Sequence, residues 1–279
     1  MCKNHNAPGY RLAEGDAGYG EAFMTPSAAN QCEFPVLVFR PRGGARDRWP
    51  IVYQLHGSNG QPLTEKGLRT LYHPDTGMQE AADFFQVIFV CVMVGRTMYL
   101  DAPNDPKVRI ASYIGEELVA WGDEHLPSIP DREHRFLAGF SMGGGGAVSL
   151  LCRYPDTFSV ALSRGGALDP AAGVRDLDWD DVWPSAARLL GDYWGPDRKN
   201  YHQNCCMNLI NHIQERDDCG IVLEVGIRDF LYKTNRRFHE RLRELRFDHI
   251  YAEYPGGHQW GREMLFSLMT HLQYFRTTR

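Results

Sequence analysis

No apolar run in this 279-residue chain is long enough to cross a bilayer; the longest is "FFQVIFVCVMVG". A transmembrane helix needs about 20 mostly apolar residues, so we expect no membrane insertion. The first residues, "MCKNHNAPGYRLAEGDAGYG", also lack the apolar core of a secretory signal peptide. The sequence therefore predicts a cytoplasmic location.

An excess of positive charge is missing as well. The chain has 30 Lys and Arg residues against 35 Asp and Glu residues, which gives a formal net charge of −5. Nucleic-acid-binding proteins gather Lys and Arg into a patch or stripe, and none is visible here. We therefore expect no nucleic-acid partner.

Cysteines are few and show no repeating spacing. The chain has seven, an odd number, which favours reduced thiols over a disulfide framework. Cys205 and Cys206 are adjacent and lack the two-residue gap of a zinc knuckle or a redox motif, so we interpret them as structural. Because no cluster of metal ligands is found either, we predict neither a metal nor a cofactor.

What the chain does have is an alternation of strand-like and helix-like segments. Several strand-like segments are continuous apolar runs, as in strands buried on both faces of a sheet. Expected strands are 35–41, 50–57, 86–95, 134–140, 158–166, 220–226 and 248–257, and expected helices are 77–85, 111–126, 146–154, 234–247 and 261–275. This alternation predicts an α/β fold in which helices cover both faces of a mostly parallel central sheet. We expect one domain over residues 1–279.

One segment breaks the alternation. Residues 167–219 carry Trp179, Trp183 and Trp194 among prolines and aspartates. We expect this segment to be an aromatic-rich insertion, or lid, over one end of the sheet.

A serine lies at the junction of a strand and a helix. Residues 139–143 read Gly-Phe-Ser-Met-Gly, the G-x-S-x-G pattern, directly after an expected strand and before an expected helix. This strand, turn and helix form the elbow on which a nucleophilic serine is exposed. The glycines allow the sharp turn and the close packing of the helix on the sheet. We therefore predict Ser141 as the nucleophile of an acyl-transfer reaction.

A serine nucleophile needs a histidine base and an acid that orients the histidine. Of the histidines after Ser141, only His258 follows the carboxyl end of an expected strand. Asp229 holds the corresponding place after 220–226, and Asp169, after an earlier strand, is the alternative acid. The order Ser, Asp, His favours Ser141, Asp229 and His258 as a catalytic triad.

Two backbone N–H groups are expected to form an oxyanion hole. One donor in such sites is the residue after the nucleophile, here Met142, and the other comes from the loop after an early strand. The loop "HGSNG" supplies Ser58 for this role. His56 precedes the serine in the chain and is predicted to brace this loop.

Aromatic side chains are expected to line the substrate site. We predict contacts from Trp179 and Trp183 of the insertion, from Tyr99 in the loop "VGRTMYLDAP", and from Trp260 beside the histidine. Aromatic groups offer apolar walls to an acyl or aryl group. The alternative is that the tryptophans only pack the insertion onto the body of the protein.

Three arginines follow expected strands at the same edge of the sheet as Ser141: Arg96, Arg164 and Arg228. Guanidinium groups recognise carboxylates and phosphates, so we predict that one of them, Arg164 above the others, contacts an anionic or polar part of the substrate. The alternatives are ordinary surface arginines or salt bridges to aspartates of the insertion, namely Asp176, Asp178, Asp180 and Asp181.

Four motifs together resemble the esterase D family of α/β-hydrolases, in its tributyrin-esterase-like branch. They are "LHGSNG", "AGFSMGGGGA" followed by "RYPDTFSVALSRGGALD", "GIRDFLY" and "YPGGHQW". The resemblance covers about residues 35–275 and implies an α/β-hydrolase fold, carboxylesterase chemistry on a small-molecule ester and the same triad. Two positions depart from it: Gly145, where relatives often have an aromatic or polar residue, and Arg164, where a small residue is common.

Two other functions stay open at this point. An acyltransferase that passes the acyl group to a small alcohol or amine would use the same triad. A non-catalytic binding protein on a hydrolase scaffold would be expected to lose a triad residue, and none is missing here. The sequence also leaves a homo-oligomer open.

Overall fold

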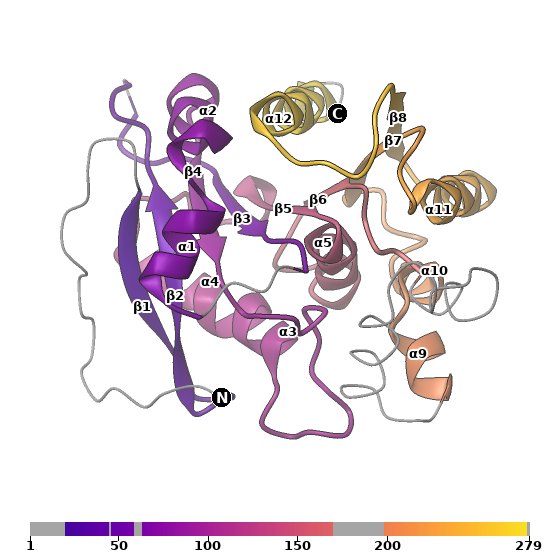
Figure 1. The fold of residues 1–279 in the computed structure, drawn as a ribbon, viewed down its shortest axis with the longest axis horizontal. Coiled ribbons are helices and arrows are strands. Elements are labelled where there is room, and N and C mark those ends of the chain that lie inside the picture. The colour runs from indigo at the N-terminus through magenta and orange to yellow at the C-terminus, as the bar shows by residue number, and fades with distance from the viewer. Residues whose placement is uncertain (1–19, 45, 59–62, 170–197, 278–279) are drawn as a thin grey trace.

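The computed structural model describes residues 20–44, 46–58, 63–169 and 198–277, and their strands all lie in one eight-stranded sheet of order β1-β2-β4-β3-β5-β6-β7-β8 (Figure 1). The strands are β1 Glu21–Ser27, β2 Cys32–Phe39, β3 Ile51–Leu55, β4 Ile88–Val92, β5 Arg135–Phe140, β6 Val160–Arg164, β7 Gly220–Gly226 and β8 His249–Tyr254. The strands from β4 to β8 in this order pair in parallel, and β1 and β2 add an antiparallel edge. The predicted mostly parallel sheet is confirmed.

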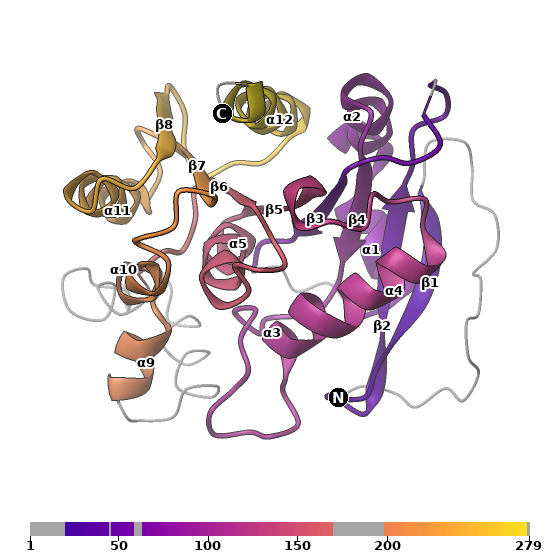
Figure 2. The ribbon, with the colours of Figure 1, turned by 180° about the vertical axis from the view of Figure 1, so that it is seen from behind.

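Helices cover both faces of the sheet because its central strands are apolar on both sides. One core packs under α1 Glu65–Leu71, α2 Met78–Phe85 and α12 Arg262–Thr277. The other packs under α3 Ile110–Ser112, α4 Leu118–His125, α5 Met142–Arg153, α10 Cys206–Leu209 and α11 Tyr232–Glu244. Figures 1 and 2 show the two layers from opposite sides.

All seven expected strands are present: β7 has the predicted bounds, β2 begins three residues earlier and ends two residues earlier than predicted, and the other five are shorter. Two elements were not predicted: β1, an edge strand that contains a proline, and α1, a seven-residue helix with a glycine inside. Neither segment carries the long periodic pattern on which such a prediction depends. The expected helix over 111–126 is interrupted by a π-helical turn, Tyr113–Glu117.

The insertion is described only in part. Its last third forms α9 Arg198–Asn204 and α10, while residues 170–197, which include Trp179, Trp183 and Trp194, lie outside the described residues. The predicted lid and the predicted contacts of Trp179 and Trp183 thus fall on residues outside the described ranges.

The cysteines correct one expectation. Five described cysteines are free and buried, Cys205 and Cys206 among them. Cys32, however, is disulfide-bonded, so the prediction that every cysteine is a reduced thiol is wrong for Cys32. The thiol count therefore no longer supports a cytoplasmic location. In the described ranges, no helix has the length and apolar character needed to span a membrane.

Candidate active site

Ser141 lies on a strained turn between β5 and α5. Its backbone has φ 57° and ψ −118°, a left-handed conformation that is uncommon for a residue with a side chain. Backbone hydrogen bonds hold it there: the Ser141 N–H donates to Arg164 O (3.0 Å), and the Ser141 carbonyl accepts from the N–H groups of Gly145 (3.1 Å) and Ala167 (2.9 Å). Such strain persists where the surrounding structure enforces it, often at functional sites.

The glycines after Ser141 are needed because α5 approaches the sheet very closely. A Cβ atom at Gly143 would lie 2.2 Å from the backbone oxygen of Leu55. At Gly145 it would lie 2.3 Å from the backbone oxygen of Ala167. Neither backbone can yield easily, so the departure at Gly145 reflects how the chain after β6 packs on α5.

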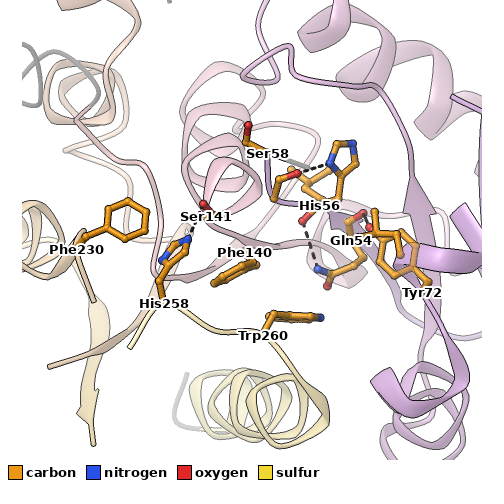
Figure 3. Close-up of a pocket in the computed structure, with 12 residues that line it drawn as sticks. Gln54, His56, Ser58, Tyr72, Phe140, Ser141, Phe230, His258 and Trp260 are labelled. Atoms are coloured by element: carbon orange, nitrogen blue, oxygen red, sulfur yellow. Dashed lines mark hydrogen bonds between the residues drawn. The ribbon is translucent and has the colours of Figure 1, made fainter. Parts of the chain in front are cut away.

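Ser141, His258 and Asp229 form a continuous chain of contacts. His258 Nε2 lies 2.9 Å from Ser141 Oγ, and His258 Nδ1 lies 2.8 Å from Asp229 Oδ2 (Figure 3 shows the first contact). The buried Asp229 carboxylate can only accept, so the Nδ1–H donates to it and Nε2 is left to accept the serine proton. The Asp229 Oδ1 atom is itself fixed by the N–H of Leu231 at 2.8 Å.

The chain segment after β6 packs closely against Asp229 and His258. Gly165 has φ +49°, and a Cβ atom there would lie 2.6 Å from Asp229 Oδ2 and 3.3 Å from His258 Nδ1. Asp169, the alternative acid, lies instead beside Cys205. Burial, and after it the Asp169 carboxylate, raises the pKa of that thiol to about 11. The geometry therefore favours Asp229.

Of the two predicted oxyanion-hole donors, Met142 directly follows Ser141 and Ser58 lies in the cavity wall. Met142 is the first residue of α5, where backbone N–H groups have no partner within the helix. Ser58 follows β3 and lines the same cavity as Ser141 (Figure 3). The dipole of α5 adds a positive field at this point.

His56 braces the loop that carries Ser58. Its Nδ1 lies 2.7 Å from Gly57 O, its Nε2 accepts from the N–H of Val94 at 3.2 Å, and Tyr99 donates its hydroxyl proton to His56 O at 2.9 Å. Burial lowers the pKa of His56 to about 4, so the imidazole stays neutral near pH 7. Since both ring nitrogens are engaged, this histidine supports the loop.

Tyr99 does not line the cavity, and its predicted contact with substrate is wrong. The side chain is fully buried and its hydroxyl is occupied by His56 O. Tyr99 does follow β4, as predicted, but its ring packs in the core instead of pointing toward the cavity.

Arg164 also corrects a prediction. Its side chain is only 3% exposed and pairs through Nη1 with Glu224 Oε2 at 2.8 Å. The guanidinium lies over the ring of Tyr254, 3.2 Å from its centroid. Arg164 does not line the cavity and its guanidinium is held by Glu224 and Tyr254, so the predicted contact with substrate is wrong. It does form an ion pair, but with the buried Glu224 of β7 instead of the insertion's aspartates. Arg96 and Arg228 are exposed, and neither lines the cavity.

Glu224 joins the sheet to α12. Besides Arg164, its carboxylate contacts Ser267 Oγ and His271 Nδ1, both at 2.7 Å, and its side chain is fully buried. Because Ser141 N–H donates to the carbonyl of Arg164, this network supports the turn that holds the serine.

Arg164→Met is therefore expected to destabilise the fold by about 3–5 kcal/mol, because the buried Glu224 carboxylate loses its guanidinium partner and keeps only its contacts with Ser267 and His271. Arg42→Met is the matched control: Arg42 pairs with Asp83 but is 59% exposed, and such pairs contribute about 0–1 kcal/mol. Urea unfolding of both variants measures the difference. Equal losses would show that the buried pair does not stabilise the protein.

A cavity of about 450 Å³ opens beside Ser141. It is lined by Gln54, Leu55, His56, Gly57, Ser58, Leu71, Tyr72, Phe140, Ser141, Phe230, His258 and Trp260. Phe140 and Phe230 flank the His258 ring, with centroids at 4.5 and 4.3 Å (Figure 3). Trp260, for which a contact with substrate is predicted, lies in this wall.

Several of these lining residues were not predicted. Phe140 is the variable residue before the serine, and Phe230 follows the acid, so both could have been inferred from the motifs. Tyr72 closes α1, a helix that the sequence reading missed. Gln54 is an amide side chain in the buried strand "IVYQL". Its presence there could have indicated a polar position in the cavity wall.

Known proteins resemble this chain over most of its length. An acetyl esterase of Caldicellulosiruptor saccharolyticus is 27% identical over 170 residues, which are 59% of this chain and 62% of that protein. Esterase Rv1288 of Mycobacterium tuberculosis (strain ATCC 25618 / H37Rv) is 24% identical over 242 residues, 77% of this chain and 50% of that protein. The chain thus spans about half to three fifths of these curated relatives.

Solved structures share the fold. FphF, a fluorophosphonate-binding serine hydrolase of Staphylococcus aureus, superposes with a TM-score of 0.72 at 17% identity, over 97% of this chain and 99% of that one. The predicted α/β-hydrolase fold is confirmed. The family model described as "Putative esterase" matches residues 27–271, nearly the whole described sheet together with the serine, the acid and the histidine, and the chain therefore belongs to this esterase family.

Proposed function

We propose that this protein is a serine carboxylesterase that hydrolyses a small-molecule ester through Ser141, His258 and Asp229. The observation that carries the proposal is the unbroken contact chain from Asp229 through His258 to a serine on a strained elbow, beside an apolar cavity. Family membership supports the same activity.

In the first half-reaction, His258 Nε2 takes the proton from Ser141 Oγ as the oxygen attacks the ester carbonyl. The negative oxygen that develops is held by the backbone N–H groups of Met142 and Ser58. His258 then gives the proton to the departing alcohol, and an acyl group remains on Ser141.

In the second half-reaction, water takes the place of the alcohol. His258 removes a proton from the water as its oxygen attacks the acyl carbonyl, then returns that proton to Ser141 Oγ as the acyl–oxygen bond breaks, and the acid is released. Throughout, Asp229 keeps the proton of the neutral imidazole on Nδ1 and stabilises the imidazolium that forms. The neutral, mostly apolar cavity wall favours an uncharged ester substituent.

The proposal is tested with 4-nitrophenyl esters of graded acyl length and the matching 4-nitroanilides. We expect turnover of the esters, a pre-steady-state burst of nitrophenol, and an added acyl mass on the peptide that contains Ser141. Product analysis with and without glycerol distinguishes hydrolysis from acyl transfer. Absence of turnover on every ester would contradict an esterase and favour a binding protein.

A further inference from the structure

Gln54 places an amide in the wall of an otherwise apolar cavity. Its neighbours along β3 alternate between the two cores: Tyr53 and Leu55 pack on one side of the sheet and Val52 on the other. The alternation puts Gln54 on the side of Val52, beneath the cavity, where an apolar residue would be expected. The side chain is 1% exposed.

The hydrogen-bonding capacity of this amide is poorly used inside the protein. Its Nε2 donates to Leu55 O at 3.4 Å, a long and weak contact. Its Oε1 is buried and, within the described part of the chain, has no hydrogen-bond partner. A buried acceptor without a hydrogen-bond partner destabilises a fold, so its presence calls for an explanation. One explanation is that a bound ligand supplies the hydrogen-bond donor.

The residues around Gln54 indicate which kind of ligand group could form a hydrogen bond with its amide oxygen. In Figure 3 the Gln54 amide points toward the space between Phe140 and Trp260, away from Ser58. The Tyr72 hydroxyl is turned away from the cavity, since it donates to the backbone oxygen of Gln54 at 3.3 Å. No Lys, Arg, Asp or Glu is among the described residues that line the cavity.

We propose that Gln54 determines substrate specificity: its Oε1 accepts a hydrogen bond from a neutral donor, a hydroxyl or an amide N–H, on the apolar substituent of the ester that fills this cavity. The terminal torsion of glutamine is broad, so the amide can turn its oxygen to the donor at little cost. This inference rests on the proposed esterase function and adds the class of substituent that the site selects.

The test compares methyl esters that differ in a single group. One set is methyl phenylacetate with a hydroxyl, a methoxy or no substituent at ring position 3 or 4; the other is methyl hexanoate with a hydroxyl, a methoxy or no substituent on C6. A methoxy group fills similar space but cannot donate. For the wild-type protein we expect kcat/KM to favour hydroxyl over methoxy about tenfold or more on at least one scaffold, since one satisfied hydrogen bond at a buried acceptor is worth that much.

Gln54→Met keeps the side-chain volume and removes the acceptor. We expect its hydroxyl-to-methoxy ratio to fall to about 1, and because this ratio compares two esters within one variant, it does not depend on the variant's overall rate. Its Tm should rise by about 2–4 °C, because an unpaired buried polar group is gone. The matched control is Gln79→Met: Gln79 donates to Arg40 O, away from the cavity, and its ratio should stay that of the wild type.

The outcomes separate the two claims. If the wild-type protein turns over 4-nitrophenyl acetate but shows a ratio near 1 on both scaffolds, the role of Gln54 is overturned and the esterase proposal stands. That measurement needs no variant, so it decides even if Gln54→Met fails to fold. A Gln54→Met variant with the wild-type ratio and a lowered Tm would assign Gln54 to the fold alone. Failure of every ester, the acetate included, overturns the esterase proposal and this inference with it.

Discussion

Ser141→Ala is expected to lower kcat by a factor of about 10⁶ and to abolish labelling by a fluorophosphonate probe, since no other group can form the acyl-enzyme. The fold should survive, because the strained turn is held by backbone hydrogen bonds of residue 141, which alanine retains. Gel-based labelling and ester hydrolysis, with circular dichroism as the check on folding, measure the effect.

Ser149→Ala is the matched control for the serine. Ser149 lies two turns further along α5 and its Oγ accepts from Arg153, so it has no path to the cavity. Labelling of this variant should equal that of the wild type. Persistent labelling of Ser141→Ala, at a peptide other than the one that contains residue 141, would overturn the nucleophile assignment.

The positions of the serine, acid and histidine could be predicted because each buried strand is an apolar run, and the end of the run marks the end of the strand. In a parallel sheet the carboxyl ends of the strands meet at one edge, so Ser141 after β5, Asp229 after β7 and His258 after β8 had to lie near one another. The order Ser, Asp, His along the chain and the glycines around Ser141 then favoured Ser141, Asp229 and His258 as the triad.

The same rule failed for Tyr99 and Arg164 because strand position does not tell where a side chain points. Tyr99 follows β4 and Arg164 is the last residue of β6, both at the correct edge, yet both side chains are buried in the protein. The sequence did hold a clue to one of them: Glu224 is the one charge in the strand "GIVLEVG", and a charge in a fully buried strand requires a partner. Gln54 in "IVYQL" is the corresponding clue to the cavity.

His258→Ala is expected to lower kcat by a factor of about 10³–10⁶, because Ser141 loses the base that accepts its proton. Asp229→Asn should cost about 10⁴ or less, for a different reason. An asparagine can donate its amide N–H to Nδ1, which places the imidazole proton on Nε2, and an Nε2–H faces Ser141 Oγ without a free lone pair. Both effects are measured as kcat on one short-chain ester.

Asp169→Asn is the control for the acid. The Asp169 carboxylate acts on the Cys205 thiol, whereas His258 Nδ1 lies 2.8 Å from Asp229 Oδ2, so the activity of Asp169→Asn should stay within about threefold of the wild type. A larger loss in Asp169→Asn than in Asp229→Asn would show that the acid was assigned to the wrong strand. If His258→Ala retained most of the activity, the imidazole would not be the base, and the contact of 2.9 Å between Nε2 and Ser141 Oγ would be a feature of the resting fold alone.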